Sequence, residues 1–188
     1  MKYDKSFLRN KILNLRKKKY LSIKKFNFNL IFNLIKKKFN NKKIIIAGYY
    51  PSYYEANILQ FLEDADKKKF KIALPAIKSS GKMFFKLWGF RDPLHVNKFG
   101  ILEPNNSNKN IIPDLVMVPL VAFDKKLNRI GYGKGFYDKS LKKISKNKKK
   151  TIFLGIAFSF QKISFVPAEK HDIKLDYIFT EQGIISSK

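Results

Sequence analysis

Apolar residues recur at helical spacing over the first 40 residues of the chain and then gather into short β-type runs. In residues 4–19 the apolar positions fall on one face of a helix whose other positions are mostly basic. Ser22 has the residue type of an N-cap and predicts a second helix that ends near Phe39. We therefore predict an N-terminal pair of helices within residues 1–40, packed on the rest of the protein.

The remainder of the chain carries apolar runs of strand length, separated by amphipathic segments. Helical spacing predicts a helix at 55–67 and another after Gly135, and Pro75 is expected to stop the strand that contains it. The apolar runs predict strands at 43–50, 70–75, 82–90, 114–123, 151–158 and 175–180, with a short extended piece in a loop at 99–104.

Strands alternate with helices through the middle of the chain, which is the pattern of α/β proteins with a mainly parallel sheet. The sequence contains no internal repeat and no low-complexity linker. We predict one three-layer domain over residues 1–188, with helices on both sides of the central sheet. In such sheets ligands bind beyond the carboxyl ends of the strands, so we look for chemistry in the loops that follow strands.

Composition restricts the class of protein. A hydrophobic content of 45%, with 18 Phe and 9 Tyr, is typical of a packed globule. The absence of cysteine excludes disulfides, thiolate metal sites and cysteine nucleophiles, and fits a reducing compartment. The N-terminus has no uninterrupted apolar run of signal-peptide type, and no stretch is long and apolar enough to span a bilayer. We therefore expect a cytoplasmic protein.

The formal charge of +26 at pH 7 is almost entirely lysine, because only four of the 40 basic residues are arginine. Arginine is the residue that makes two-pronged contacts with phosphates and bases. The lysines form short runs near the predicted helix ends, where cations suit the helix dipole. We favour a lysine-rich solvated surface over a dedicated nucleic-acid-binding protein, which remains an alternative that the charge allows.

The stretch NRIGYGKGFYDKSL, residues 128–141, holds three of the nine glycines of the chain within five positions. Alternate glycines let an anion approach the backbone N–H groups, and the following helix adds its N-terminal dipole. Arg129 and Lys134 supply positive charge, and Asp138 suits the Mg²⁺ that accompanies a nucleotide phosphate. A tight strand-to-helix turn, with Tyr137 in the core and Asp138 as a helix-dipole acid, is the structural alternative.

A longer segment around this stretch, PLVAFDKKLNRIGYGKGFYDKSL at 119–141, resembles the signature of the 5-formyltetrahydrofolate cyclo-ligase family. Further segments match the family in the same order along nearly the whole chain: KSFLR (5–9), AGYYPSYYEAN (47–57), ALP (73–75), FGILEP (99–104), PDLVMVP (113–119), LGIAFSFQ (154–161) and VPAEKHDIKLD (166–176). The resemblance implies an ATP-dependent closure of 5-formyltetrahydrofolate to 5,10-methenyltetrahydrofolate, with release of ADP and phosphate.

The resemblance also implies roles for individual residues, which we state as predictions. Residues matched to ATP binding are Lys5, Arg9, Arg129, Ile130, Gly131, Tyr132, Gly133, Lys134, Gly135, Phe136 and Tyr137. Those matched to folate binding are Glu55, Tyr50, Tyr132 and Phe136, and those matched to Mg²⁺ are Asp138 and Asp172. Within the nucleotide loop, Lys134, Arg129 and Tyr137 are the predicted catalytic groups.

Some features depart from the family or stay open. Tyr53 and Tyr54 replace the small or charged residues that are usual before the glutamate, and Trp88 is either a stacking surface or core. His95 and His171 have no partner at metal-ligand or triad spacing, so neither is assigned to catalysis. Another α/β enzyme that binds a phosphorylated small molecule is a further alternative. We expect a monomer or a weak dimer.

Overall fold

The computed structural model describes residues 4–22, 25–78, 80–105, 107–146 and 150–187, and its centre is an eight-stranded sheet. In order across the sheet the strands are β12 (Gly183–Ser186), β11 (Tyr177–Thr180), β10 (Ile152–Ile156), β7 (Leu115–Pro119), β1 (Ile45–Ala47), β2 (Lys71–Ile77), β3 (Met83–Leu87) and β6 (Asn110–Ile111). The strands from β11 to β2 run parallel, and β12, β3 and β6 pair antiparallel at the two sides. The mainly parallel sheet predicted from the sequence is confirmed.

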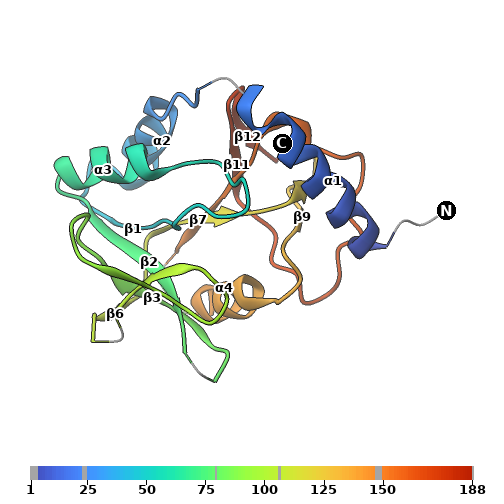
Figure 1. The fold of residues 1–188 in the computed structure, drawn as a ribbon. Helices are drawn as coiled ribbons and strands as arrows, with labels where there is room; N and C mark the ends of the chain where they lie inside the picture. Colours follow the sequence, from blue (N-terminus) through green and yellow to red (C-terminus); the bar gives the residue numbers. More distant parts are fainter. Residues whose placement is uncertain (1–3, 23–24, 79, 106, 147–149, 188) are drawn as a thin grey trace.

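Helices cover both faces of this sheet, as Figure 1 shows. The helices α2 (Asn29–Phe39) and α3 (Leu59–Lys67) pack on one face, and α4 (Phe136–Ser145) packs on the other. Consecutive residues of a strand point to opposite faces, so Ile46 joins the core under α2 and α3 while Ala47 joins the core under α4. This double burial explains the continuous apolar runs and confirms the three-layer prediction.

Helix α1 (Lys5–Lys19) lies outside these layers, beside a small hairpin. The hairpin consists of β8 (Ala122–Phe123) and β9 (Arg129–Ile130), and Ile12 of α1 packs against Ala122 and Ile130. A second small sheet pairs β4 (Leu94–Val96) with β5 (Leu102–Pro104). Short 3₁₀ turns at Tyr20–Ser22 and Ser159–Gln161 complete the elements.

Several predicted boundaries are wrong, for identifiable reasons. The second helix begins at Asn29, whose N–H donates to the Asn27 side chain at 3.2 Å, whereas Ser22 lies in the 3₁₀ turn after α1 and its hydroxyl donates to the Lys19 carbonyl at 2.9 Å. Residues 23 and 24 lie outside the described part of the chain. The third helix begins at Leu59, whose N–H donates to the Asn57 side chain at 2.9 Å, so Glu55 belongs to the turn before it.

Two strands also differ from prediction. Strand β2 continues through Pro75 to Ile77, since its pairing with β1 ends at Ala73 and leaves Pro75 paired only with Phe85 on β3. A proline without an N–H donor is tolerated where one side of a strand needs no ladder bond. The run at 114–123 is not one strand, because β7 ends at Pro119 and the chain then enters the hairpin.

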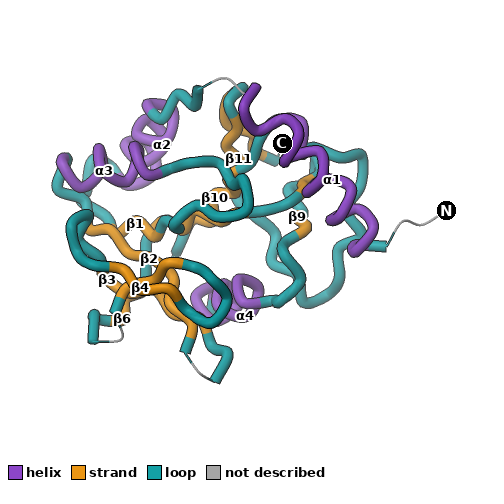
Figure 2. The backbone as a smooth tube through the Cα atoms, in the orientation of Figure 1, coloured by secondary structure: helices purple, strands orange, loops and turns teal. Residues whose placement is uncertain are grey.

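The topology places a crevice at the carboxyl ends of β1 and β7. These neighbours are where the strand order reverses: from β1 the chain continues to β2 on one side, and from β7 it continues to β10 on the other. The connections that leave the two strand ends therefore diverge, which is the ligand-binding position of an open α/β sheet. Figure 1 labels β1 and β7, and Figure 2 draws the loops that connect the strands in teal.

Candidate active site

A cavity of about 500 Å³ occupies this crevice, and every residue predicted for ATP, folate or Mg²⁺ binding lines it. The lining comes from α1, the loop after β1, the ends of β2 and β7, the glycine stretch, the 97–103 loop and the segment 169–172. Segments that are far apart in the sequence thus meet at one place. This convergence agrees with the predicted grouping, while the role of each residue stays a prediction.

Asp124 builds the hairpin turn that leads into the glycine stretch. Its buried carboxylate accepts hydrogen bonds from the N–H groups of Lys126 and Asn128 at 2.9 and 3.0 Å. It also accepts from the Asn128 side chain at 2.9 Å and from the Val166 N–H at 3.2 Å. These bonds satisfy a buried charge and hold the turn through Leu127, whose φ is 63°. The start of the glycine stretch is therefore held in place by the hydrogen bonds of Asp124.

The glycines of the stretch serve different purposes. Gly133 has φ of 94° and Gly135 has φ of 65°, a left-handed conformation that disfavours side chains. A side chain on Gly133 would also meet the Arg9 guanidinium, about 3.3 Å away. At Gly131 an added Cβ would meet nothing within 4 Å, so the protein itself does not require glycine there. The space beside Gly131 is open, and Arg9 Nε donates to the Gly131 carbonyl at 2.8 Å.

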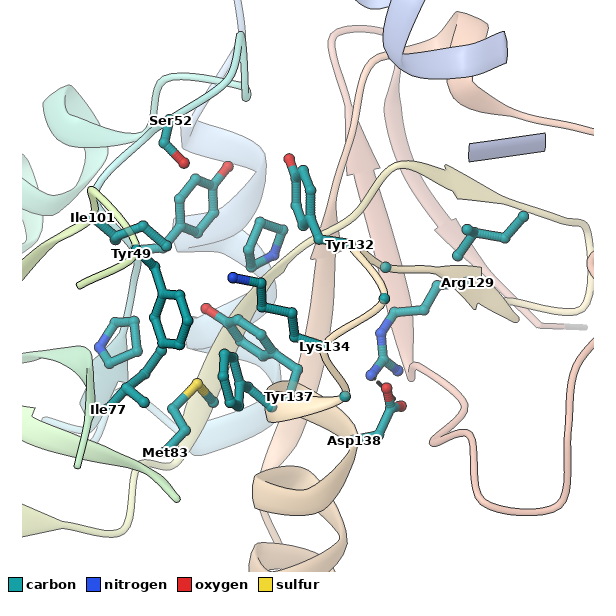
Figure 3. Close-up of a pocket in the computed structure, with 18 of the residues that line it drawn as sticks. Tyr49, Ser52, Ile77, Met83, Ile101, Arg129, Tyr132, Lys134, Tyr137 and Asp138 are labelled. Atoms are coloured by element: carbon teal, nitrogen blue, oxygen red, sulfur yellow. Dashed lines mark hydrogen bonds and ion pairs between the residues drawn. The ribbon is translucent and has the colours of Figure 1, made fainter. Parts of the chain in front are cut away.

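Arg129 is buried and committed to protein groups. It is 5% exposed, and its guanidinium donates to Asp138 Oδ1 at 2.5 Å and to the Ile173 carbonyl. Figure 3 shows the Arg129 guanidinium aimed at Asp138. Burial lowers the pKa of Arg129, and the Asp138 carboxylate opposes that effect. Arg129 therefore links the hairpin to helix α4, and both of its terminal guanidinium nitrogens already donate to protein groups.

Lys5 is likewise paired. Its ammonium donates to Asp172 Oδ2 at 2.7 Å and to Glu169 Oε1 at 2.9 Å, which fastens the start of α1 to the 169–172 segment. Burial acts to lower the pKa of Lys5, but the hydrogen bonds and charges of these two carboxylates raise it above the ordinary value of a lysine. Burial also works against ionisation of Asp172, and the Lys5 contact nevertheless lowers the pKa of that carboxyl. Of the predicted ATP-binding cations, Arg9 and Lys134 make no ion pair with a described residue.

The two predicted metal ligands are both engaged with donors. Asp138 Oδ1 accepts from Arg129 and, at 3.2 Å, from the Ile173 N–H, while Asp172 Oδ2 accepts from Lys5 and the Glu169 N–H. The described residues contain no group of three His, Cys, Asp or Glu side chains that could hold a metal ion. Within the described residues, Asp138 and Asp172 thus offer single carboxylate oxygens that already accept hydrogen bonds.

The opposite end of the cavity holds Glu55, which is 6% exposed. It closes a turn that begins at Ser52, whose N–H donates to Glu55 Oε2 at 2.8 Å. Tyr53 and Tyr54 fill that turn with φ of 48° and 61°, a strained conformation for side chains of this size. Burial raises the pKa of Glu55, and hydrogen bonds with Tyr132 and Ser52 and the charge of Arg16 oppose that rise. The Tyr53–Tyr54 departure therefore lies in the element that presents this carboxylate.

Aromatic groups line the middle of the cavity. The Lys134 ammonium lies 3.7 Å from the centre of the Phe99 ring, and the Phe99 and Phe136 rings are 5.4 Å apart. The Tyr137 hydroxyl is buried without a hydrogen-bond partner among the described residues, and burial raises its pKa. Figure 3 labels Lys134 and Tyr137 among the side chains that line the cavity. A buried hydroxyl without a partner is a group that a ligand can satisfy.

Other residues were unassigned or missed in the sequence. Tyr50 lines the cavity as predicted, whereas Trp88 does not line it: Trp88 is buried in the core and donates to the Asp92 carbonyl at 3.0 Å. Phe99 and Glu103 were assigned no role, although both belong to the family-matched segment FGILEP; Phe99 lies in the loop before β5 and Glu103 lies on β5. Glu103 is buried and accepts from the Ile77 N–H at 3.0 Å, so it ties the small sheet to β2.

A model of the 5-formyltetrahydrofolate cyclo-ligase family matches residues 1–181. The chain belongs to this family. Among curated relatives, the 5-formyltetrahydrofolate cyclo-ligase of Haemophilus influenzae is 41% identical over 87 residues, which are 44% of this chain and 46% of the relative. The Escherichia coli K12 cyclo-ligase is 31% identical over 120 residues, 61% of this chain and 65% of the relative. The aligned regions thus span about half to two thirds of these relatives.

Solved structures of the same kind extend the likeness over the full fold. The structure of 5,10-methenyltetrahydrofolate synthetase from Aquifex aeolicus has a TM-score of 0.75 and 28% identity, and the match covers 98% of this chain and 93% of that chain. The synthetase from Mycoplasma pneumoniae, at 24% identity and a TM-score of 0.69, supports the fold. No helix within the described residues is long and apolar enough to cross a membrane.

Proposed function

We propose that the chain catalyses the ATP-dependent cyclisation of 5-formyltetrahydrofolate to 5,10-methenyltetrahydrofolate, with release of ADP and phosphate. The observation that carries this proposal is the meeting of all the family-matched residues in one cavity at the strand-order switch. A cavity of about 500 Å³ that opens to solvent suits a reaction between two large substrates. If the glycine stretch served only as a tight strand-to-helix turn, these residues would not need to line a common cavity.

The chemistry requires activation of a poor leaving group. The formyl oxygen attacks the γ-phosphorus of ATP and ADP departs, and N10 of the folate then attacks the activated carbon. Loss of the N10 proton and of phosphate completes the new ring. Protein side chains form no covalent bond in this scheme, so catalysis rests on positioning and on neutralising phosphate charge.

The nucleotide end of the cavity is the glycine stretch with its cations. The open space beside Gly131 admits a phosphate to the backbone, and the start of α4 adds a positive dipole. Arg9 and Lys134 are the cations free to meet phosphate oxygens, whereas Lys5 and Arg129 hold the surrounding framework in place. The Tyr137 hydroxyl lies in position to meet whichever substrate reaches the centre.

The folate end is the Glu55 turn. A buried carboxylate accepts two N–H bonds from an amino-pyrimidine edge, and the low exposure of Glu55 strengthens such bonds. Tyr50, Tyr132 and Phe136 supply the nearby aromatic surface.

Mg²⁺ enters this proposal as the companion of ATP. When bound it neutralises phosphate charge, with Asp138 and Asp172 offering carboxylate oxygens beside it. The cytoplasmic location and the monomeric or weakly dimeric state stay predictions.

The test is an absorbance assay for the methenyl product. Purified protein is mixed with 5-formyltetrahydrofolate, Mg²⁺ and ATP, and each component is omitted in turn. We expect product only in the complete mixture; its absence there would contradict the proposal. Arg9→Gln and Lys134→Gln should raise KM for ATP roughly 10-fold or more, because each removes about 1.4 kcal/mol of phosphate contact. The control Lys139→Gln, at an exposed lysine on helix α4 that does not line the cavity, should leave KM unchanged.

A further inference from the structure

Arg16 is a buried cation at the end of helix α1, where the lysines that follow it are exposed. It is 1% exposed, whereas its neighbours Lys17 and Lys18 are exposed. Its guanidinium donates to the Tyr53 carbonyl at 2.6 Å, to the Tyr132 hydroxyl at 2.7 Å and to the Leu120 carbonyl at 3.4 Å. Burying an arginine costs free energy unless it is hydrogen-bonded, and these contacts of Nη1 and Nη2 offset that cost, while Nε has no hydrogen-bond partner among the described residues.

The contacts of Arg16 reach both elements that form the folate end. One nitrogen, Nη2, bonds the strained turn that presents Glu55 and the hydroxyl of Tyr132. The guanidinium also lies over the Tyr132 ring, 5.5 Å from its centre. Neither Lys17 nor Lys18 makes contacts of this kind. The contacts therefore depend on where Arg16 lies on α1, and not on the general positive charge of that helix.

The direction of the hydrogen bonds follows from the chemistry of the groups. Arginine only donates, so the Tyr132 hydroxyl must accept from Arg16. The phenol proton is then left to point toward the Glu55 carboxylate, whose negative charge adds to burial in raising the pKa of the Tyr132 phenol. The result is a chain from Arg16 through Tyr132 to Glu55. It leaves the remaining lone pairs of Glu55 for the N–H groups of a substrate.

We propose that Arg16 is a positioning residue for folate recognition, which orients Tyr132 and the Ser52–Glu55 turn so that the Glu55 carboxylate faces the substrate. Arg16 touches neither substrate in this scheme. The proposal rests on the proposed function and deepens it, because it assigns helix α1 to both ends of the cavity. Lys5 and Arg9 near the start of the helix serve the nucleotide end, and Arg16 near its end serves the folate end.

A pH signature separates positioning from a merely structural role. The groups that face Glu55 are Arg16 from α1, Tyr132 from the glycine stretch, Tyr49 after β1, Tyr137 from α4 and the N–H of Ser52. Of the charged side chains among them, Arg16 is the one that lowers the pKa of Glu55. Its removal should let that pKa rise further, so the carboxylate becomes protonated at a higher pH and KM for the folate rises sooner on acidification.

The experiment compares Arg16→Gln, Arg16→Lys and the matched control Lys17→Gln by steady-state kinetics between pH 5.5 and 8, with enzyme-free rates subtracted. We expect Arg16→Gln to raise KM for 5-formyltetrahydrofolate at least tenfold and to leave KM for ATP within about twofold. The acid limb of its pH profile, which is the rise of KM for the folate as the pH falls, should move to higher pH. Arg16→Lys keeps the charge and loses the fork, so it should retain the wild-type acid limb with a partly raised KM. Lys17→Gln should match the wild type.

The opposite results would overturn the inference. If Arg16→Gln keeps the wild-type KM and acid limb, or raises both KM values equally with no pH shift, Arg16 serves packing alone. Should Arg16→Gln fail to fold, Tyr132→Phe removes the middle of the chain and keeps the ring. It should move the acid limb in the same direction, and in its background Arg16→Lys should add little to KM. An inactive wild-type protein would contradict the proposed function instead; equilibrium binding of 5-formyltetrahydrofolate, measured by fluorescence quenching across the same pH range, then tests Arg16 without turnover.

Discussion

The two edges of the central sheet both carry a pocket with several cations, yet they are built in opposite ways. At the carboxyl edge Arg16 and Arg129 are nearly fully buried, and the terminal guanidinium nitrogens of both donate to named acceptors. At the amino edge a pocket of about 520 Å³ is lined by exposed lysines: Lys38, Lys42, Lys43, Lys69 and Lys71. The two pockets have nearly the same volume, so the size of a hollow does not distinguish them.

The lysines reach the amino edge because of the topology. In a parallel α/β sheet each helix returns the chain to the amino ends of the strands, and the lysine runs lie at those helix ends. A run of cations there suits the helix dipole and needs no ligand. The difference teaches that burial and fixed geometry of charge mark a site, whereas the number of charges does not.

The largest effect on this comparison should come from Arg129→Gln. Removing one partner of a buried pair leaves Asp138 without its cation, which costs about 3 kcal/mol or more of unfolding free energy. Denaturant titration measures the loss, and Lys71→Gln at the amino edge is the control, expected to change stability by less than about 0.5 kcal/mol. Equal losses for the two variants would erase the distinction between the edges.

A sharper division is expected within the glycine stretch. Gly133→Ala forces a side chain to φ of 94° against Arg9, so it should lose about 1–2 kcal/mol of stability. Gly131→Ala points into open space, so it should keep stability and raise KM for ATP severalfold. Denaturation and ATP kinetics on both variants test this. A destabilised Gly131→Ala protein with normal ATP kinetics would mean that the space does not receive the nucleotide.

A smaller effect concerns the pH dependence of stability at Glu55. Because burial raises its pKa, the folded protein binds a proton on this carboxyl more tightly than the unfolded chain does. The ionised form therefore opposes folding at neutral pH, and that opposition fades as the pH falls through the folded pKa. Glu55→Gln should be more stable than the wild type at pH 7, with a narrowing margin toward roughly pH 4. Thermal melts at both pH values check it; a variant less stable at pH 7 would contradict the sign.

The smallest effect is expected at the amino edge itself. Replacing Lys42, Lys69 and Lys71 together by glutamine should leave KM for both substrates unchanged and stability within about 0.5 kcal/mol per site. Electrophoretic mobility with mixed nucleic acid across a salt series tests the alternative. Binding that survives physiological salt and disappears in the triple variant would assign this edge to nucleic acid.

Much of the fold could be predicted from the sequence, since strands such as Ile152–Ile156 are buried on both faces and therefore read as continuous apolar runs. The short strands β4, β6, β8 and β9 could not be predicted, because two or three residues carry no period. Gly183–Ser186 was also missed: its residues are mostly half-buried and alternate weakly. The strand that contains Pro75 was predicted to end there, but whether a proline ends a strand depends on which neighbouring strand is paired at that position.

The site was predicted in part, through resemblance and not through spacing. The glycine stretch indicated an anion cradle, and its open space at Gly131 agrees with that reading. Arg16 could not be predicted, because it stands among Lys17, Lys18 and Lys19 in a basic helix, and only tertiary contacts bury it. The pairing of Lys5 with Asp172 likewise depends on residues 167 positions apart.

The most direct test of the account is the stoichiometry of a single turnover. Protein in excess over 5-formyltetrahydrofolate is mixed with Mg²⁺ and ATP, and the methenyl chromophore and inorganic phosphate are followed in the same sample. If the carboxyl-edge cavity binds both substrates together, the two products should appear in a one-to-one ratio, and neither should appear without the folate. Phosphate released without methenyl product, or methenyl product formed without phosphate, would contradict it.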